Sequence, residues 1–115
     1  MQATIEYEPV VTKLLEKSQQ GRLNWEKRGW REFACEIEGQ YTFASTETED
    51  GYGLTMKDSF GDVIFSISSE EAIVYDDPKK EELFNMLRDL HELARKKALN
   101  VDEKIATATG LLDKI

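Results

Sequence analysis

The chain has 115 residues, of which 40% are hydrophobic and 33% are charged, and its formal net charge is −8. These values fit one folded α+β domain over residues 1–115 and exclude a disordered chain. No apolar run approaches the roughly 20 residues that a helix needs to cross a bilayer, so we expect no membrane association. A single cysteine, Cys35, and an N-terminal stretch without secretory-signal features predict a cytoplasmic protein.

The negative charge is concentrated in the middle of the chain. Residues 32–78 contain twelve Asp or Glu residues and a single cation, Lys57, which gives a local balance of −11. The segment before this stretch sums to +2 and the segment after it to +1. Such an asymmetry bears on partners and solubility rather than on fold.

The first predicted element is an amphipathic helix over residues 9–20. Pro9 suits the first helical position and Gly21 suits a C-terminal stop. The apolar residues between them recur on one arc of about 140°: Val10, Val11, Leu14 and Leu15. Trp25 and Trp30 lie in the connector that follows, and we expect both rings to close an edge of the core.

Four antiparallel strands that form a meander are predicted between residues 31 and 68. Apolar residues alternate with polar ones in each run, as in Phe33, Cys35 and Ile37 or in Tyr52, Leu54 and Met56. Gly39-Gln40 and Glu49-Asp50-Gly51 provide two turns, and Asp58-Ser59-Phe60-Gly61 is typical of a type I turn with a left-handed glycine.

The last strand of this meander has apolar residues on both faces. If Asp58 pairs with Asp62, Met56 lies beside Ile64, and Val63 and Phe65 then fall on the other face. Three explanations remain open at this point. A β-bulge shifts the register, another part of the chain covers the second face, or a second molecule covers it.

The rest of the chain is predicted to be helical over residues 79–98 and 101–113. Asp77-Pro78 supplies a cap residue and a proline for the first of these helices. Asn100 and Glu103 have the spacing of a capping box for the second, although one kinked helix over residues 79–114 fits as well. The helices are expected to pack on one face of the sheet. The predicted core includes Leu14, Leu87, Leu90 and Ile105.

This order of elements resembles small proteins of uncharacterised bacterial families that share a helix, a four-stranded meander and a helical tail. The residues that carry the resemblance are Gly21 to Trp25, Asp58 to Gly61, Leu93 to Arg95 and Ala98 to Ile105. Relatives of this kind tend to have glycine at the position of Asn100, and both residues tolerate a left-handed conformation. The resemblance implies a fold but transfers no activity and no catalytic residue.

The sequence offers little for catalysis. His91 is the only histidine, and it lies within the apolar arc of its helix, which favours a partly buried structural ring over a proton shuttle or metal ligand. Cys35 alternates with apolar residues and is expected in the core. No pair of carboxylates has the spacing of a calcium loop. We therefore expect no enzymatic activity, no cofactor and no metal.

The acidic strands instead suggest a protein-binding module. We expect such a module, acting as a regulator or inhibitor, to dock a partner with a basic surface, or a second copy, through its sheet. The expected contact residues are Glu36, Glu38, Phe43, Glu47, Glu49 and Phe65. The alternative is a nucleic-acid-binding accessory protein that uses Trp25, Arg28 and Arg31 with the basic end of the helix over residues 79–98, although the acidic sheet disfavours phosphate.

Overall fold

The protein is described from a computed structural model that covers residues 8–69 and 79–115. The elements are α1 (Glu8–Gln19), β1 (Glu26–Gly29), β2 (Glu32–Ile37), β3 (Tyr41–Glu47), β4 (Tyr52–Asp58), β5 (Val63–Ser68), α2 (Lys79–Leu99) and α3 (Val101–Leu112). The predicted α+β fold is confirmed. The sheet has five antiparallel strands in the order β1-β2-β3-β4-β5, one more than expected.

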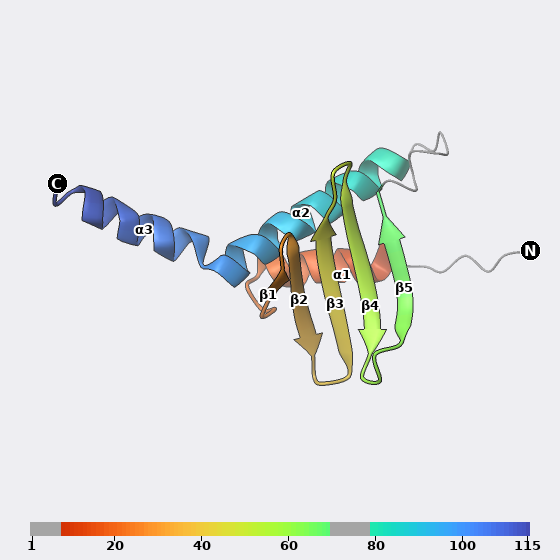
Figure 1. Cartoon of the computed structure of the whole chain (residues 1–115). Coiled ribbons are helices and arrows are strands. Elements are labelled where there is room, and N and C mark those ends of the chain that lie inside the picture. The colour runs from red at the N-terminus through yellow and green to blue at the C-terminus, as the bar shows by residue number, and fades with distance from the viewer. Residues whose placement is uncertain (1–7, 70–78) are drawn as a thin grey trace, which may run out of the picture.

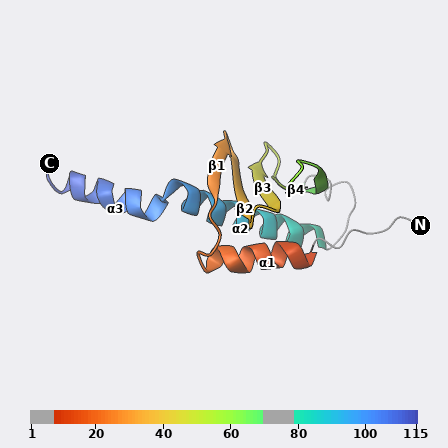
Figure 2. The same ribbon diagram turned by 90° about the horizontal axis from the view of Figure 1, so that it is seen from below.

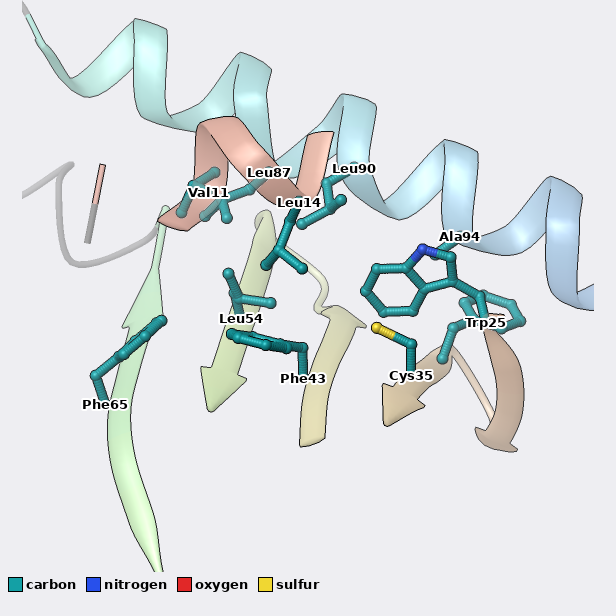
Figure 3. Close-up of a cluster of buried hydrophobic side chains, with 11 residues drawn as sticks. Val11, Leu14, Trp25, Cys35, Phe43, Leu54, Phe65, Leu87, Leu90 and Ala94 are labelled. Atoms are coloured by element: carbon teal, nitrogen blue, oxygen red, sulfur yellow. The ribbon is translucent and has the colours of Figure 1, made fainter. Parts of the chain in front are cut away.

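The helices α1 and α2 lie on the same face of the sheet (Figures 1 and 2). Side chains from that face and from both helices form one buried cluster (Figure 3). Leu14, Leu87 and Leu90 belong to it, as predicted. The described helices leave the opposite face of the sheet uncovered. Within residues 8–69 and 79–115, no helix has the length and apolarity needed to cross a membrane.

The end of α1 explains how the chain turns toward the sheet. Gly21 has a φ of 70°, and its N–H donates to the carbonyl of Ser18, while the N–H of Arg22 donates to the carbonyl of Lys17. These two bonds form a Schellman motif, which favours glycine because the motif needs a left-handed residue. Trp25 then donates from Nε1 to Oγ of Ser18 at 3.0 Å and is buried.

The strand that the sequence did not reveal is β1. Its residues Glu26 to Gly29 are mostly charged and exposed, so they show none of the alternation that marks a half-buried strand. Backbone pairing with β2 holds this edge strand, with an irregularity between Lys27 and Gly29. The expectation for Trp30 is wrong, because its side chain is 81% exposed.

A β-bulge resolves the apolar pattern of β5. Asp58 and Asp62 are joined as predicted, since the N–H of Asp58 donates to the carbonyl of Asp62. The register then shifts, so that Met56 pairs with Phe65 instead of Ile64. Phe65 therefore faces the core, while the bulge leaves Val63 and Ile64 exposed.

The chain breaks between α2 and α3 at Asn100. This residue is left-handed, with φ 49° and ψ 50°, and its side chain makes no capping hydrogen bond, so the predicted capping box does not form. The expected cap at Asp77-Pro78 lies outside the described residues. Two helices are present rather than one, and α3 extends away from the sheet (Figure 1). Ile105 is 59% exposed, so its predicted place in the core is wrong.

Candidate functional site

The four predicted contact glutamates are exposed but lie at two opposite ends of the sheet. Glu36 and Glu38 stand beside the β2–β3 turn, whereas Glu47 and Glu49 stand beside the β3–β4 turn. The seven residues of β3 separate the two ends, which corresponds to about 20 Å of strand. The four carboxylates therefore do not form one docking face.

The two predicted aromatic anchors are in the core. Phe43 is 6% exposed and Phe65 is 7% exposed, and both point from the sheet toward the helices (Figure 3). Cys35 pairs with Phe43 in the register, which places their side chains on the same face of the sheet. Neither ring is available at the surface, so the expectation that they anchor a partner is wrong.

One end of the sheet nevertheless combines carboxylates with exposed rings. The β2–β3 and β4–β5 turns lie at the same end of the sheet (Figure 1). Tyr41 on β3 pairs with Asp58 on β4 at this end. Tyr41 is 39% exposed and Phe60 is 88% exposed. We call this surface the acidic edge, and its residues are Glu36, Glu38, Tyr41, Asp58, Phe60 and Asp62.

The tip of the acidic edge is held by its own hydrogen bonds. Oδ1 of Asp58 accepts from the N–H of Phe60 at 2.9 Å and from the N–H of Asp62 at 3.0 Å. Gly61 completes the turn with a φ of 87° and donates to the carbonyl of Asp58. The Asp58 carboxylate therefore fixes the loop that presents the Phe60 ring to solvent.

A second candidate is a buried polar group at the contact between β3 and α2. Ser45 and His91 are each 1% exposed, and Oγ of Ser45 is hydrogen-bonded to Nδ1 of His91 at 2.9 Å. Nε2 of His91 lies 3.9 Å from Oε2 of Glu47. The imidazole also contacts the rings of Phe33 and Tyr52, with centroids 5.3 and 5.4 Å away.

Burial decides the protonation of this histidine. Desolvation lowers the pKa of His91, and Arg95 acts in the same direction, while Glu47 and Glu92 act against it. The ring is therefore neutral at pH 7. The sequence pattern predicted a partly buried ring for His91, whereas the structure buries it fully, and the missed signal was Ser45, a hydroxyl on the inward-facing side of β3.

Serine, histidine and glutamate are the residue types of a hydrolytic triad, but their placement here differs from one. A nucleophilic hydroxyl must be reachable by the substrate, and the Ser45 hydroxyl is enclosed. Cys35 is equally enclosed, and burial raises the pKa of its thiol to about 12, which removes the reactive thiolate. In the described part of the chain, no cluster of three or more His, Cys, Asp or Glu side chains is placed to hold a metal ion.

An open groove of about 410 Å³ lies between α1 and the sheet. Its lining is apolar apart from two lysines, and the lining residues are Pro9, Val10, Lys13, Leu14, Lys17, Leu23, Ile37 and Phe43. It shares no residue with the Ser45–His91 pair. The groove therefore gives that pair no path to a substrate.

The basic and aromatic residues of the connector are divided by the fold. Trp25 is 3% exposed, so it is not available to stack on a base. Trp30 is 81% exposed instead, and Cζ of Arg31 lies 4.1 Å from the centroid of its ring. Arg28 and Arg31 are both exposed, and Arg28 lies on β1, two residues before Trp30 in the chain.

Comparisons with protein-family models, curated proteins and solved structures find no match to this chain. The resemblance noted from short sequence motifs gains no support from them. The functional argument therefore depends on the surfaces described above.

Proposed function

We propose that this protein is a non-catalytic module that binds a basic protein through the acidic edge, as a regulator or inhibitor would. The observation that carries this proposal is Phe60, a large ring that is 88% exposed at the tip of a hydrogen-bonded turn. Exposed aromatic residues are the usual anchors of protein interfaces, and a rigid loop loses little conformational entropy on binding.

The charge around this ring supports a basic partner. Glu36, Glu38 and Asp62 are exposed on the acidic edge, and Lys57 is the only cation between residues 36 and 62. A pair of exposed charges at contact distance contributes only about 1 kcal/mol in water. The carboxylates therefore mainly raise the association rate and make it dependent on salt, while Phe60 and Tyr41 provide the affinity.

The test is capture of partners by the tagged protein from an extract of the source organism, followed by binding assays with the purified partner. Phe60→Ala should weaken binding by about 30-fold, the loss typical of an interface hot spot. Glu36→Gln with Glu38→Gln should lower the association rate at low salt. The matched control, Glu47→Gln with Glu49→Gln at the opposite end of the sheet, should bind as the natural protein does. Equal binding by all variants would contradict the proposal.

A second candidate function is supported by the exposure of Trp30. An accessible tryptophan beside Arg31, with Arg28 two positions earlier in the chain, can stack on a base while the guanidinium groups bind phosphate. A fluorescence assay with a labelled single-stranded oligonucleotide tests this reading. Binding that is lost in Trp30→Ala and retained in Phe60→Ala would favour the nucleic-acid function over the acidic edge.

A further inference from the structure

The helix α3 is an apolar surface that the acidic edge does not explain. None of its residues, all of which are described, is buried. Its large apolar side chains are more than half exposed: Ile105 59%, Leu111 58% and Leu112 68%, followed by Ile115 at 101% just after the helix. The left-handed Asn100 directs the helix away from the sheet (Figure 1). The body of the protein, which consists of α1, the sheet and α2, therefore does not cover this face.

The spacing of the apolar residues indicates what kind of surface covers them. Val101, Ile105, Ala108, Leu112 and Ile115 follow one another at intervals of four, three, four and three residues. This is the a/d spacing of a helix that packs against another helix. Leu111, which is 58% exposed, lies beside these residues and brings the apolar arc to about 120°. An a/d face with one flanking position is typical of helices in bundles, so this face fits another helix.

This face of α3 is also complementary to itself. When two copies of α3 are aligned antiparallel about Ala108, Val101 faces Ile115 of the other copy, and Ile105 lies at the level of Leu111, one residue from Leu112. The smallest residue, Ala108, meets its own copy at the twofold axis, where the helices come closest. Such an arrangement is an isologous interface, in which the same surface serves both partners. Antiparallel helices also oppose their dipoles favourably.

The local charge of α3 permits this contact, although each chain has a formal net charge of −8. Residues 101–115 contain Asp102, Glu103, Lys104, Asp113 and Lys114, a balance of −1. The acidic bodies lie at opposite ends of an antiparallel pair, where their repulsion is weakest. The remaining repulsion acts over distances that salt screens.

We propose that α3 forms an antiparallel pair with α3 of a second copy, so that the protein is a weak dimer with two acidic edges. This interface uses a surface different from that of the proposed function. It covers eight large apolar side chains in total, which is small for a stable dimer, so a dissociation constant on the order of micromolar or weaker is expected. The dimer should tighten as salt is added, whereas binding of a basic partner should weaken.

Sedimentation of the full chain over about two decades of concentration tests the proposal. The natural protein should pass from monomer to dimer, and Ile105→Ser with Leu112→Ser should stay monomeric at every concentration. The matched control, Ala106→Ser with Thr107→Ser, introduces the same residue on the opposite face of α3 and should dimerise normally. Since α3 contributes nothing to the core, near-ultraviolet circular dichroism should show an intact body in all variants. A monomer throughout, or a dimer that the Ile105→Ser and Leu112→Ser changes do not weaken, would overturn the dimer.

Cysteine cross-linking tests the direction of the pair. Val101→Cys and Ile115→Cys should each fail to cross-link alone under mild oxidation, whereas an equal mixture of the two should give a covalent dimer. The native Cys35 does not interfere, because it is 1% exposed. Cross-linking of each variant with itself would show a parallel pair and overturn the antiparallel arrangement.

Discussion

At the scale of single residues, the Ser45–His91 pair shows how a polar group is accommodated in this core. Each residue alone would leave a buried hydrogen-bonding group unsatisfied, at a cost of about 1 to 3 kcal/mol. Together they satisfy one another, and the described residues contain no buried side-chain nitrogen or oxygen without a partner. The imidazole also fills the space between Phe33 and Tyr52. We infer that its role is structural.

This environment predicts a specific pH dependence of stability. The unfolded chain binds a proton at His91 with the ordinary pKa of 6.5, whereas burial lowers the pKa in the folded protein. Below pH 6.5 the unfolded state therefore binds more protons, and the free energy of unfolding falls by at most about 1.4 kcal/mol per pH unit. The loss continues until the pH passes the lowered pKa of the folded state.

Urea unfolding at a series of pH values between about 7.5 and 5.5 measures this slope. The sequence has one histidine, so no other side chain has its ordinary pKa in this window. In the control His91→Asn, the amide can still bond to Ser45 but does not titrate, and its slope should be close to zero. An equal slope in both proteins would show that His91 is not the group responsible.

At the scale of the elements, the two helices that follow the sheet have opposite relations to it. Leu87 on α2 is 1% exposed and lies in the core cluster, whereas Ile105 on α3 is 59% exposed. Sequence periodicity placed both residues in the core. An apolar stripe identifies which face of a helix is covered, but it does not identify the covering partner.

Substitution to alanine separates the two cases. Leu87→Ala should lower the free energy of unfolding by about 2 to 5 kcal/mol, because it removes buried methyl groups and leaves a cavity. Ile105→Ala should change it by about 0.5 kcal/mol or less at dilute concentration, since that residue is 59% exposed and lies outside the core cluster. Chemical denaturation followed by tryptophan fluorescence measures both, because unfolding exposes the buried Trp25 while Trp30 is already exposed. A large loss for Ile105→Ala would mean that α3 packs on the body.

The predictable elements are those with local signals. The boundaries of α1 follow from Pro9 and Gly21, and the β4–β5 turn follows from Asp58 to Gly61. β1 escaped prediction because backbone pairing at a charged edge leaves no pattern in the side chains. Phe65 faces the core because of a bulge, and Ile105 is exposed because of the backbone angles of Asn100. Neither the bulge nor these angles can be derived from the sequence alone.

The residues of the acidic edge were predicted only in part, for the same reason. Glu36 and Glu38 belong to the acidic edge, but Glu47 and Glu49 lie at the other end of the sheet. Phe43 is buried because a three-residue turn pairs it with Cys35, and the predicted Gly39-Gln40 turn did not define that register. Tyr41 and Phe60 were not selected because a residue in or beside a turn gives no periodic signal of its exposure.

At the scale of the whole molecule, the protein consists of a body and an arm. The radius of gyration is 16.1 Å, whereas a compact chain of this length would have about 13 Å. The excess reflects α3, which lengthens the molecule to 65 Å along one axis. Every residue of the buried cluster comes from α1, the connector after it, the sheet or α2.

This division predicts that the body and the arm are energetically separate. A chain that stops after Leu99 should retain the free energy of unfolding of the full chain to within about 0.5 kcal/mol at dilute concentration, because no buried residue is removed. At high concentration the two should diverge. Pairing of α3 stabilises the full chain by mass action, so its unfolding midpoint should rise with protein concentration, while that of the shortened chain should not. Denaturation followed by tryptophan fluorescence over a range of concentrations checks both statements. A loss of several kcal/mol at dilute concentration would show that α3 is part of the folded body, and a midpoint independent of concentration in both chains would show that it does not pair.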